Sequence, residues 1–143
     1  MDLFKAIEIS AAGLSAERTR IEVAAANLAN MNSSSPAGVQ GYRPMTAVIH
    51  ANATAFADLV HGKRPSMPVV RAEVVAQSGP SVRTAYEPGH PDADANGLVS
   101  YPAIDHTGEM MTVVTALRSY EANLAALQVT KTLAAKALDI GAQ

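Results

Sequence analysis

The chain lacks cysteine and tryptophan, and aromatic residues make up only 4% of it. Without cysteine it has no disulfide framework and no thiolate metal site. Much of the 48% hydrophobic share is alanine, so few large side chains exist to fill a three-dimensional core. Alanine instead favours helices that approach one another closely.

The sequence also lacks a concentration of charge and a long apolar run. The formal net charge is −2, and the eleven Lys and Arg are scattered, which gives no electrostatic footprint for nucleic acid or an anionic membrane. Asp2, Lys5 and Glu8 interrupt the apolar N-terminus, and no apolar stretch approaches the ~20 residues that cross a bilayer. We therefore expect neither a cleaved signal peptide nor a transmembrane span.

Proline and glycine divide the chain into three segments. All eight prolines lie between Pro36 and Pro102, together with six of the nine glycines. Such a distribution indicates two long helical ends around a turn-rich middle. We predict an N-terminal helix within residues 1–32, a β-rich region over 33–102 and a C-terminal helix within 103–143.

Both terminal segments carry narrow apolar seams. Between Asp2 and about Asn30, large apolar residues recur at every seventh position: Ile7, Leu14, Ile21 and Leu28. Between about Asp105 and Ile140 the spacing alternates between three and four, broken only by Lys131: Met110, Val113, Leu117, Tyr120, Leu124, Leu127, Ala134 and Leu138. Asp105 is placed to cap the second helix.

Short β-branched or alternating runs bounded by Gly and Pro predict strands in the middle region, over 46–50, 69–75, 82–86 and 98–101. Residues 51–60 are compatible with a short helix or an extended loop. We expect a mobile loop near residues 51–68.

The resulting fold class is α+β, mainly α, with the two long helices pairing as an antiparallel or coiled-coil-like bundle beside a small β-rich domain. Alanine-rich helices of this length keep apolar surface after pairing, so we expect neighbouring subunits to cover it. The candidate interface residues are Ile7, Leu14, Ile21, Asn27, Leu28, Asn30, Leu117, Arg118, Tyr120, Asn123, Leu124 and Leu127.

Several of these residues have two interpretations. Asn27 and Asn30 either hydrogen-bond across subunits to fix register or fray the end of the first helix. Tyr120 either joins an interface cluster with Arg118 and Glu121 or packs in the core beside solvated charges. The sequence leaves both questions open.

No catalytic, cofactor or metal site is expected. Asp92, Asp94 and Gly97 match the first half of a calcium loop, but Ala103 stands where the bidentate glutamate should fall. The alternative to a calcium loop is a purely structural polar turn in which Asn96 and Gly97 close a hairpin. The four histidines share no ligand spacing, and Ser33, Ser34 and Ser35 lack the elbow motif of a nucleophile.

The terminal segments resemble the signatures of the flagellar rod and hook-type axial proteins. The N-terminal resemblance lies in residues 12–16, Arg18, 23–24 and 27–30, followed after an insert at 33–40 by Gly41, Tyr42 and Arg43. The C-terminal resemblance lies in residues 108–110 and 118–123, and residues 86–97 resemble one rod subunit in particular. Ala103 and His106-Thr107 depart from the pattern, which puts local capping in doubt.

The resemblance implies a non-enzymatic subunit of the proximal rod, which carries torque across the periplasm. The implied partners are further copies of the chain, the rod proteins FlgB, FlgF, FlgG and FliE, and the flagellar type III export apparatus. It implies no nucleic acid and no small-molecule substrate. Export by that apparatus needs no cleaved signal peptide and places the protein in the basal body.

Other classes of function remain as alternatives. Another subunit of the rod family is the first, and a coiled-coil adaptor or export chaperone is the second. An adaptor forms small closed oligomers, whereas a rod subunit assembles only with other axial proteins. A hydrolase would need a convergent acid and base, for which the sequence gives no indication.

Overall fold

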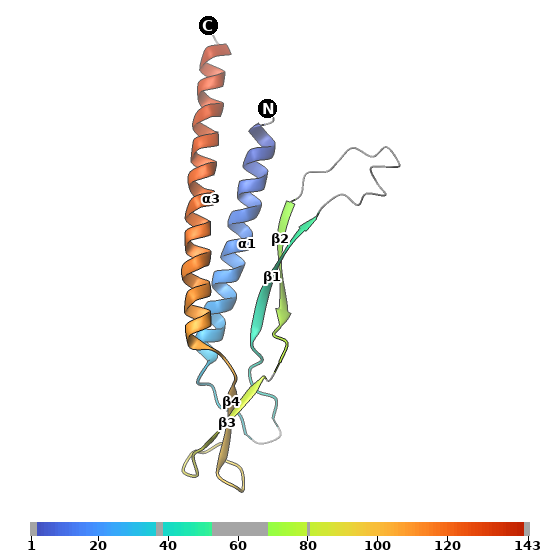
Figure 1. The fold of residues 1–143 in the computed structure, drawn as a ribbon, viewed down its shortest axis with the longest axis vertical. Helices are drawn as coiled ribbons and strands as arrows, with labels where there is room; N and C mark the ends of the chain where they lie inside the picture. The colour runs from blue at the N-terminus through green and yellow to red at the C-terminus, as the bar shows by residue number, and fades with distance from the viewer. Residues whose placement is uncertain (1–2, 37–38, 53–68, 80, 142–143) are drawn as a thin grey trace, which may run out of the picture. The chain divides into compact units, whose positions relative to one another are not determined.

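The computed structural model describes residues 3–36, 39–52, 69–79 and 81–141 (Figure 1). Helix α1 spans Leu3–Asn30 and helix α3 spans His106–Gly141. The strands between them are β1 (Met45–Asn52), β2 (Val69–Ala76), β3 (Val82–Tyr86) and β4 (Leu98–Pro102). The predicted fold class, α+β with mainly helix and small sheets in the middle, is confirmed.

The four strands form two separate two-stranded sheets. Strand β1 pairs with β2, and a hydrogen bond from Gln77 N to Pro44 O (2.9 Å) follows that pairing. Strand β3 is antiparallel to β4 with Val82 opposite Pro102 and Tyr86 opposite Leu98. The structure confirms the four predicted strands, with the bounds of β3 as predicted and those of the others within two residues.

The helix bounds also follow local sequence. Asp105 caps α3 as predicted, because its Oδ1 accepts a hydrogen bond from Thr107 N at 3.1 Å. Helix α1 ends at Asn30, as predicted, and Ser33 N then donates to Asn30 O at 3.0 Å. The open question about residues 51–60 and the expected mobile loop concern residues 53–68, which lie outside the described residues; Ala51 and Asn52 belong to β1.

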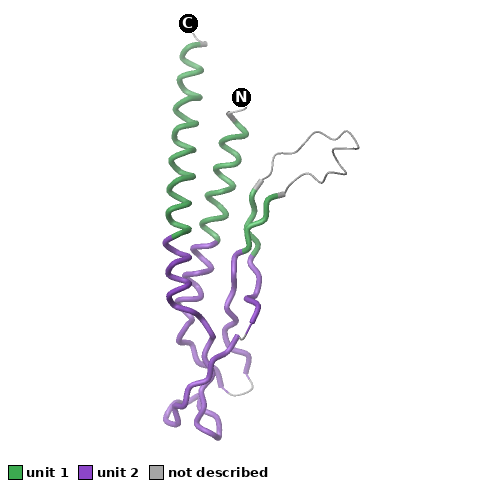
Figure 2. Tube along the Cα trace, viewed as in Figure 1, with its two compact units in different colours: residues 1–19, 48–73, 115–143 green, residues 20–47, 74–114 purple. Residues whose placement is uncertain are grey.

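The chain divides into two compact units, shown in different colours in Figure 2. Unit 1 comprises residues 1–19, 48–73 and 115–143, and unit 2 comprises residues 20–47 and 74–114. Each unit contains part of both helices, so the units do not follow the three segments of the sequence. The three-segment division stays a prediction.

Both units have small cores. In the described part of unit 1 the buried apolar residues are Ala16 and Ala116, and in unit 2 they are Val23, Ala24 and Val99. Three of these five are alanine, as the shortage of large side chains in the composition led us to expect. Such cores bury little apolar surface, so polar contacts carry much of the specificity within each unit.

Neither described helix contains a segment with the length and apolar character that a membrane crossing requires.

Candidate subunit interface and the clusters that support it

Asn27 is the centre of a buried polar cluster in unit 2. Its side chain is 0% exposed. Its Nδ2 donates to Met45 O at 2.7 Å and to Glu109 Oε1 at 2.8 Å. Its Oδ1 accepts from Tyr42 Oη at 2.9 Å and from Met45 N at 3.1 Å. We call Asn27, Tyr42, Met45 and Glu109 the Asn27 cluster.

The Asn27 cluster uses all the hydrogen-bonding capacity of the amide, which has two donors and two acceptor lone pairs. It joins α1, the start of β1 and the first turn of α3. The alternatives considered from the sequence, a bond across subunits or a frayed helix end, therefore do not describe Asn27. Its side chain has no hydrogen-bonding group left for a neighbouring subunit.

Burial raises the pKa of Tyr42 above its usual value, and the negative charge of Glu109 raises it further. Both effects favour the neutral phenol, which is the form that donates to Asn27 Oδ1. The cluster is thus intact at neutral pH.

A second contact joins the two helices in unit 1. A Cβ at Gly13 would lie 2.9 Å from Asn123 Nδ2 and 3.0 Å from Asn123 Oδ1. Real Cβ atoms almost never approach other atoms so closely, so the Asn123 side chain occupies the space that glycine leaves. The helices approach each other here because one residue has no side chain.

These two contacts bring the N-terminal and C-terminal signatures together. Asn27 and Tyr42 of the first signature meet Glu109 of the second in one contact, and Gly13 of the first meets Asn123 of the second in the other. Sequence reasoning missed Gly13, Tyr42 and Glu109 as positioning residues. The spacing could have identified Gly13 and Glu109. Gly13 and Asn27 are two seven-residue repeats apart and so lie on one face of the first helix, as Glu109 and Asn123 do on the second.

The predicted seam of α3 separates into two lines. Val113, Tyr120, Leu127 and Ala134, seven residues apart, are half-buried. The other line contains Leu117, Leu124 and Leu138, which are 43%, 37% and 75% exposed, and Lys131 lies between the last two. We call Leu117, Leu124 and Leu138 the exposed stripe; Met110, 46% exposed, continues its spacing toward the start of α3.

The remaining candidate interface residues are half-buried or exposed. In α1, the residues Ile7, Leu14, Ile21 and Leu28 are half-buried, so each keeps some accessible surface. Asn30 Nδ2 donates to Ala26 O at 2.8 Å, within its own helix. Arg118 is exposed, and Tyr120 is half-buried, which leaves both interpretations of Tyr120 open.

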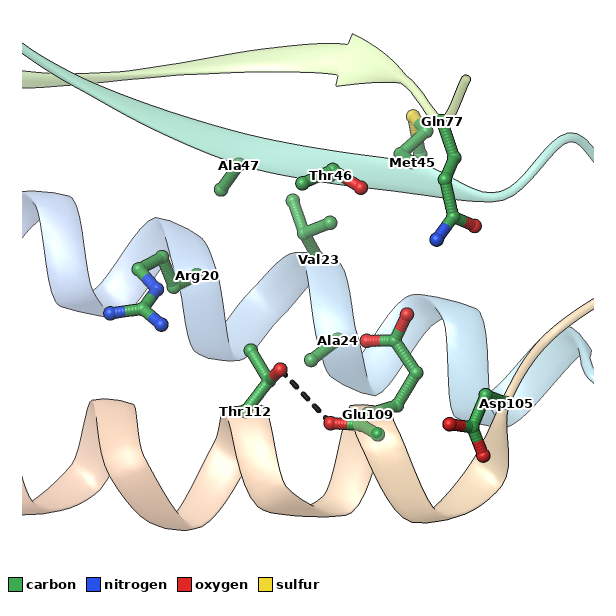
Figure 3. Close-up of a pocket in the computed structure, with 11 residues that line it drawn as sticks. Arg20, Val23, Ala24, Met45, Thr46, Ala47, Gln77, Asp105, Glu109 and Thr112 are labelled. Atoms are coloured by element: carbon green, nitrogen blue, oxygen red, sulfur yellow. Dashed lines mark hydrogen bonds between the residues drawn. The ribbon is translucent and has the colours of Figure 1, made fainter. Parts of the chain in front are cut away.

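A groove of about 330 Å³ in unit 2 lies beside the Asn27 cluster (Figure 3). Arg20, Val23 and Ala24 of α1 line one wall, Met45, Thr46 and Ala47 of β1 face them, and Glu109 and Thr112 of α3 close the third side. Among the described residues, no three His, Cys, Asp or Glu side chains are arranged to hold a metal ion.

The half calcium motif forms a self-bonded loop between β3 and β4. Asp94 Oδ1 accepts hydrogen bonds from Asn96 N and Leu98 N, both at 2.8 Å, and Ser34 Oγ donates to Asp92 Oδ2. The loop spans residues 87–97 and joins the antiparallel strands β3 and β4, with Asn96 and Gly97 at the end that leads into β4. The prediction of a polar turn in which Asn96 and Gly97 close a hairpin is confirmed, and the loop is longer than a tight two-residue turn.

Two long helices held by small and polar contacts, with large apolar residues left accessible, define a helical structural protein that associates with other chains. The family model described as flagella basal body rod protein matches residues 7–34. The chain is 32% identical over 149 residues to the flagellar basal-body rod protein FlgC of Bacillus subtilis, covering 99% of both chains. It is 36% identical over 141 residues to FlgC of Escherichia coli O6:H1, also covering 99% of both.

A third relative gives the same result. FlgC of Aquifex aeolicus is 36% identical over 131 residues, covering 92% of this chain and 91% of the relative. The chain belongs to the FlgC family of flagellar basal-body rod proteins. It is a structural subunit of the rod and assembles with other components of the flagellar basal body.

Proposed function

We propose that the chain is a subunit of the proximal rod and assembles helically with further copies of itself and with other axial proteins. In this role it transmits torque across the periplasm and catalyses no reaction. The observation that carries the proposal is the exposed stripe of α3, taken with the close helix contact of Gly13 and Asn123 and with buried alanines, Ala16 and Ala116, in the same unit. Large apolar side chains on the exposed stripe therefore remain accessible to a neighbouring subunit, while smaller residues lie inside.

The exposed stripe supplies surface for such an assembly. Full burial of a leucine side chain contributes about 1.5–3 kcal/mol, so completing the burial of a leucine that is about 40% exposed contributes roughly 1 kcal/mol. Each contact is weak, but it repeats along the helix and in every subunit. A heterologous contact of this kind generates an open helical assembly, which a rod requires.

Stiffness follows from the small residues of the inner contact. Close-packed side chains resist deformation, and the Asn123 side chain occupies the space beside Gly13, so this contact favours one register of the two helices. A torque-transmitting tube needs subunits that do not slip in this way. We infer that the polar clusters fix the shape of the subunit and that the exposed stripe fixes its neighbours.

We also propose, from the family membership, that the implied rod proteins are the partners and that the flagellar export apparatus delivers the chain without cleavage of a signal peptide. Both terminal helices are expected to be partly disordered in the free monomer, because long helices with little packing are marginal in water. Circular dichroism of the dilute monomer tests this expectation. Full helicity with exchange-protected termini would contradict it.

The decisive test is Leu124→Glu in a strain that carries the variant as its only copy. Leucine and glutamate have nearly equal helix propensity, so the helix should remain intact while a buried carboxylate becomes too costly for the interface. We expect loss of rod assembly and of swimming. The matched control, Leu124→Met, keeps an apolar side chain of similar volume and should swim.

A motile Leu124→Glu strain with intact rods would refute the use of the exposed stripe. The adaptor or export-chaperone alternative predicts a different outcome, since small closed oligomers of the purified protein would then form and the chain would be absent from isolated basal bodies. Imaging of basal bodies that carry a tagged chain distinguishes the two. If the chain were a different subunit of the rod family, the tag would lie outside the proximal part of the rod.

A further inference from the structure

The rod function leaves one motif without a role, the loop of residues 87–97 in unit 2. The loop folds on itself: Glu87 N donates to Gly97 O at 2.8 Å, and Asp94 N donates to Leu98 O at 2.9 Å. The backbone N–H groups of Leu98 and Asn96 lower the pKa of Asp94, so its carboxylate stays ionised at neutral pH. Asp94 is therefore the acceptor that organises the end of this loop.

Position 97 requires glycine. Gly97 has a φ of +74°, and a Cβ there would lie 3.0 Å from Tyr86 Cε2 and 3.1 Å from Pro88 Cβ. The residue before it, Asn96, is exposed. In an open chain, an asparagine followed by glycine is chemically labile, because no side chain on the glycine hinders the approach of its backbone nitrogen to the carboxamide.

We propose that Asn96 is a conformationally gated deamidation site, protected while the loop is folded and modified when the loop opens. In the reaction, the Gly97 nitrogen gives its proton to water or hydroxide and bonds to Asn96 Cγ. The Cγ–Nδ2 bond then breaks, and the amide nitrogen takes up a proton and leaves as ammonia. Water opens the resulting succinimide at either carbonyl, giving aspartate or isoaspartate at this position.

The folded loop restrains the nitrogen that must react, Gly97 N, and the backbone of Asn96 beside it. Gly97 N donates to Asp94 O at 2.9 Å, and Asn96 N donates to Asp94 Oδ1 at 2.8 Å. Cyclisation must break these bonds before Gly97 N can turn toward Asn96 Cγ. Since each hydrogen bond contributes a modest net stabilisation, we expect the folded loop to slow the reaction on the order of tenfold or more.

The experiment follows deamidation of the full chain at mildly alkaline pH by mass spectrometry. Trypsin cleaves after Arg83 and Arg118, and the peptide between them contains Asn96 as its single asparagine and no glutamine. A one-unit mass increase in this peptide therefore reports on Asn96. We expect the folded chain to deamidate at least ~10-fold more slowly than the same chain in denaturing urea.

Asp94→Ala removes the acceptor and should raise the rate in the folded chain toward the unfolded value, while Asn96→Gln should abolish the mass increase. Circular dichroism establishes that Asp94→Ala keeps its helices, and the comparison of folded with unfolded wild type needs no variant. Equal rates in the folded and unfolded wild type would overturn the proposal. A helical Asp94→Ala chain that deamidates no faster than wild type would also overturn it.

Discussion

Replacing Asn27 by aspartate tests the Asn27 cluster with a change of almost no volume. The substitution removes the two Nδ2 donors and places a carboxylate oxygen beside Met45 O and Glu109 Oε1, which lie 2.7 and 2.8 Å from Asn27 Nδ2. Asn27 is fully buried, so water cannot replace the lost donors. The cost of N27D therefore has a hydrogen-bonding part and a charge part.

The charge part has an upper limit. Two carboxylates this close cannot both stay ionised, so the folded protein binds a proton that the unfolded chain does not. Binding that proton at pH 7 costs about 1.4 kcal/mol per pH unit above a reference pKa near 4, or about 4 kcal/mol in total. Arg20 lines the adjoining groove, and its positive charge reduces this figure.

The hydrogen-bonding part is smaller. The shared proton restores one donor, and the remaining loss costs about 1–2 kcal/mol. We therefore expect N27D to lose about 4–6 kcal/mol at pH 7 and about 1–2 kcal/mol at pH 4. The sign follows from linkage: the pair has a raised pKa in the folded state, so the variant loses stability as pH rises from about 4 through that pKa.

The assay is urea denaturation of N27D and wild type between pH 4 and pH 7, with hydrogen exchange of residues 20–30 and 106–114 as a local reading of unit 2. Asn27→Ala is the control, since it breaks all four hydrogen bonds without adding charge and should cost a similar amount at both pH values. Adding Glu109→Gln to N27D should recover part of the loss at pH 7, while Met45 O stays unpaired. If N27D showed the same pH profile as Asn27→Ala, the assigned geometry of Asn27 and Glu109 would be wrong.

Three further expectations concern the other contacts. Gly13→Ala should raise the free energy of unfolding by about 1 kcal/mol, through helix propensity, when Asn123 is also replaced by alanine. In the presence of Asn123 the gain should be smaller, because the Asn123 side chain must move. Thermal unfolding of wild type, the two single variants and the double variant measures the difference. Asp105→Ala should cost about 1 kcal/mol through loss of the α3 cap, whereas Asp105→Asn should cost far less, as chemical denaturation would show; equal losses would exclude the cap. The raised pKa of Tyr42 means that the free energy of unfolding falls as pH rises from 10 through that pKa. Tyr42→Phe should remove this fall when unfolding is measured across alkaline pH. An unchanged fall would assign it to another group.

The sequence by itself determined the secondary structure closely. The seven-residue spacing and the absence of proline were sufficient for α1 and α3, because helix periodicity is a local property. The four strands followed in the same way from β-branched runs between Gly and Pro, and the cap at Asp105 depends on neighbours two residues away. The resemblance of the terminal motifs was likewise available from the order of residues alone.

The tertiary structure decided which polar residues meet. Asn27 and Glu109 are 82 positions apart in the sequence, and their spacing says nothing about a hydrogen bond between them. The structure also divided the seam of α3 into a half-buried line and the exposed stripe, a distinction that a heptad pattern does not contain. Burial depends on what packs against each face, and only three-dimensional contact assigns Asn27 to the interior of the subunit and leaves Leu124 accessible.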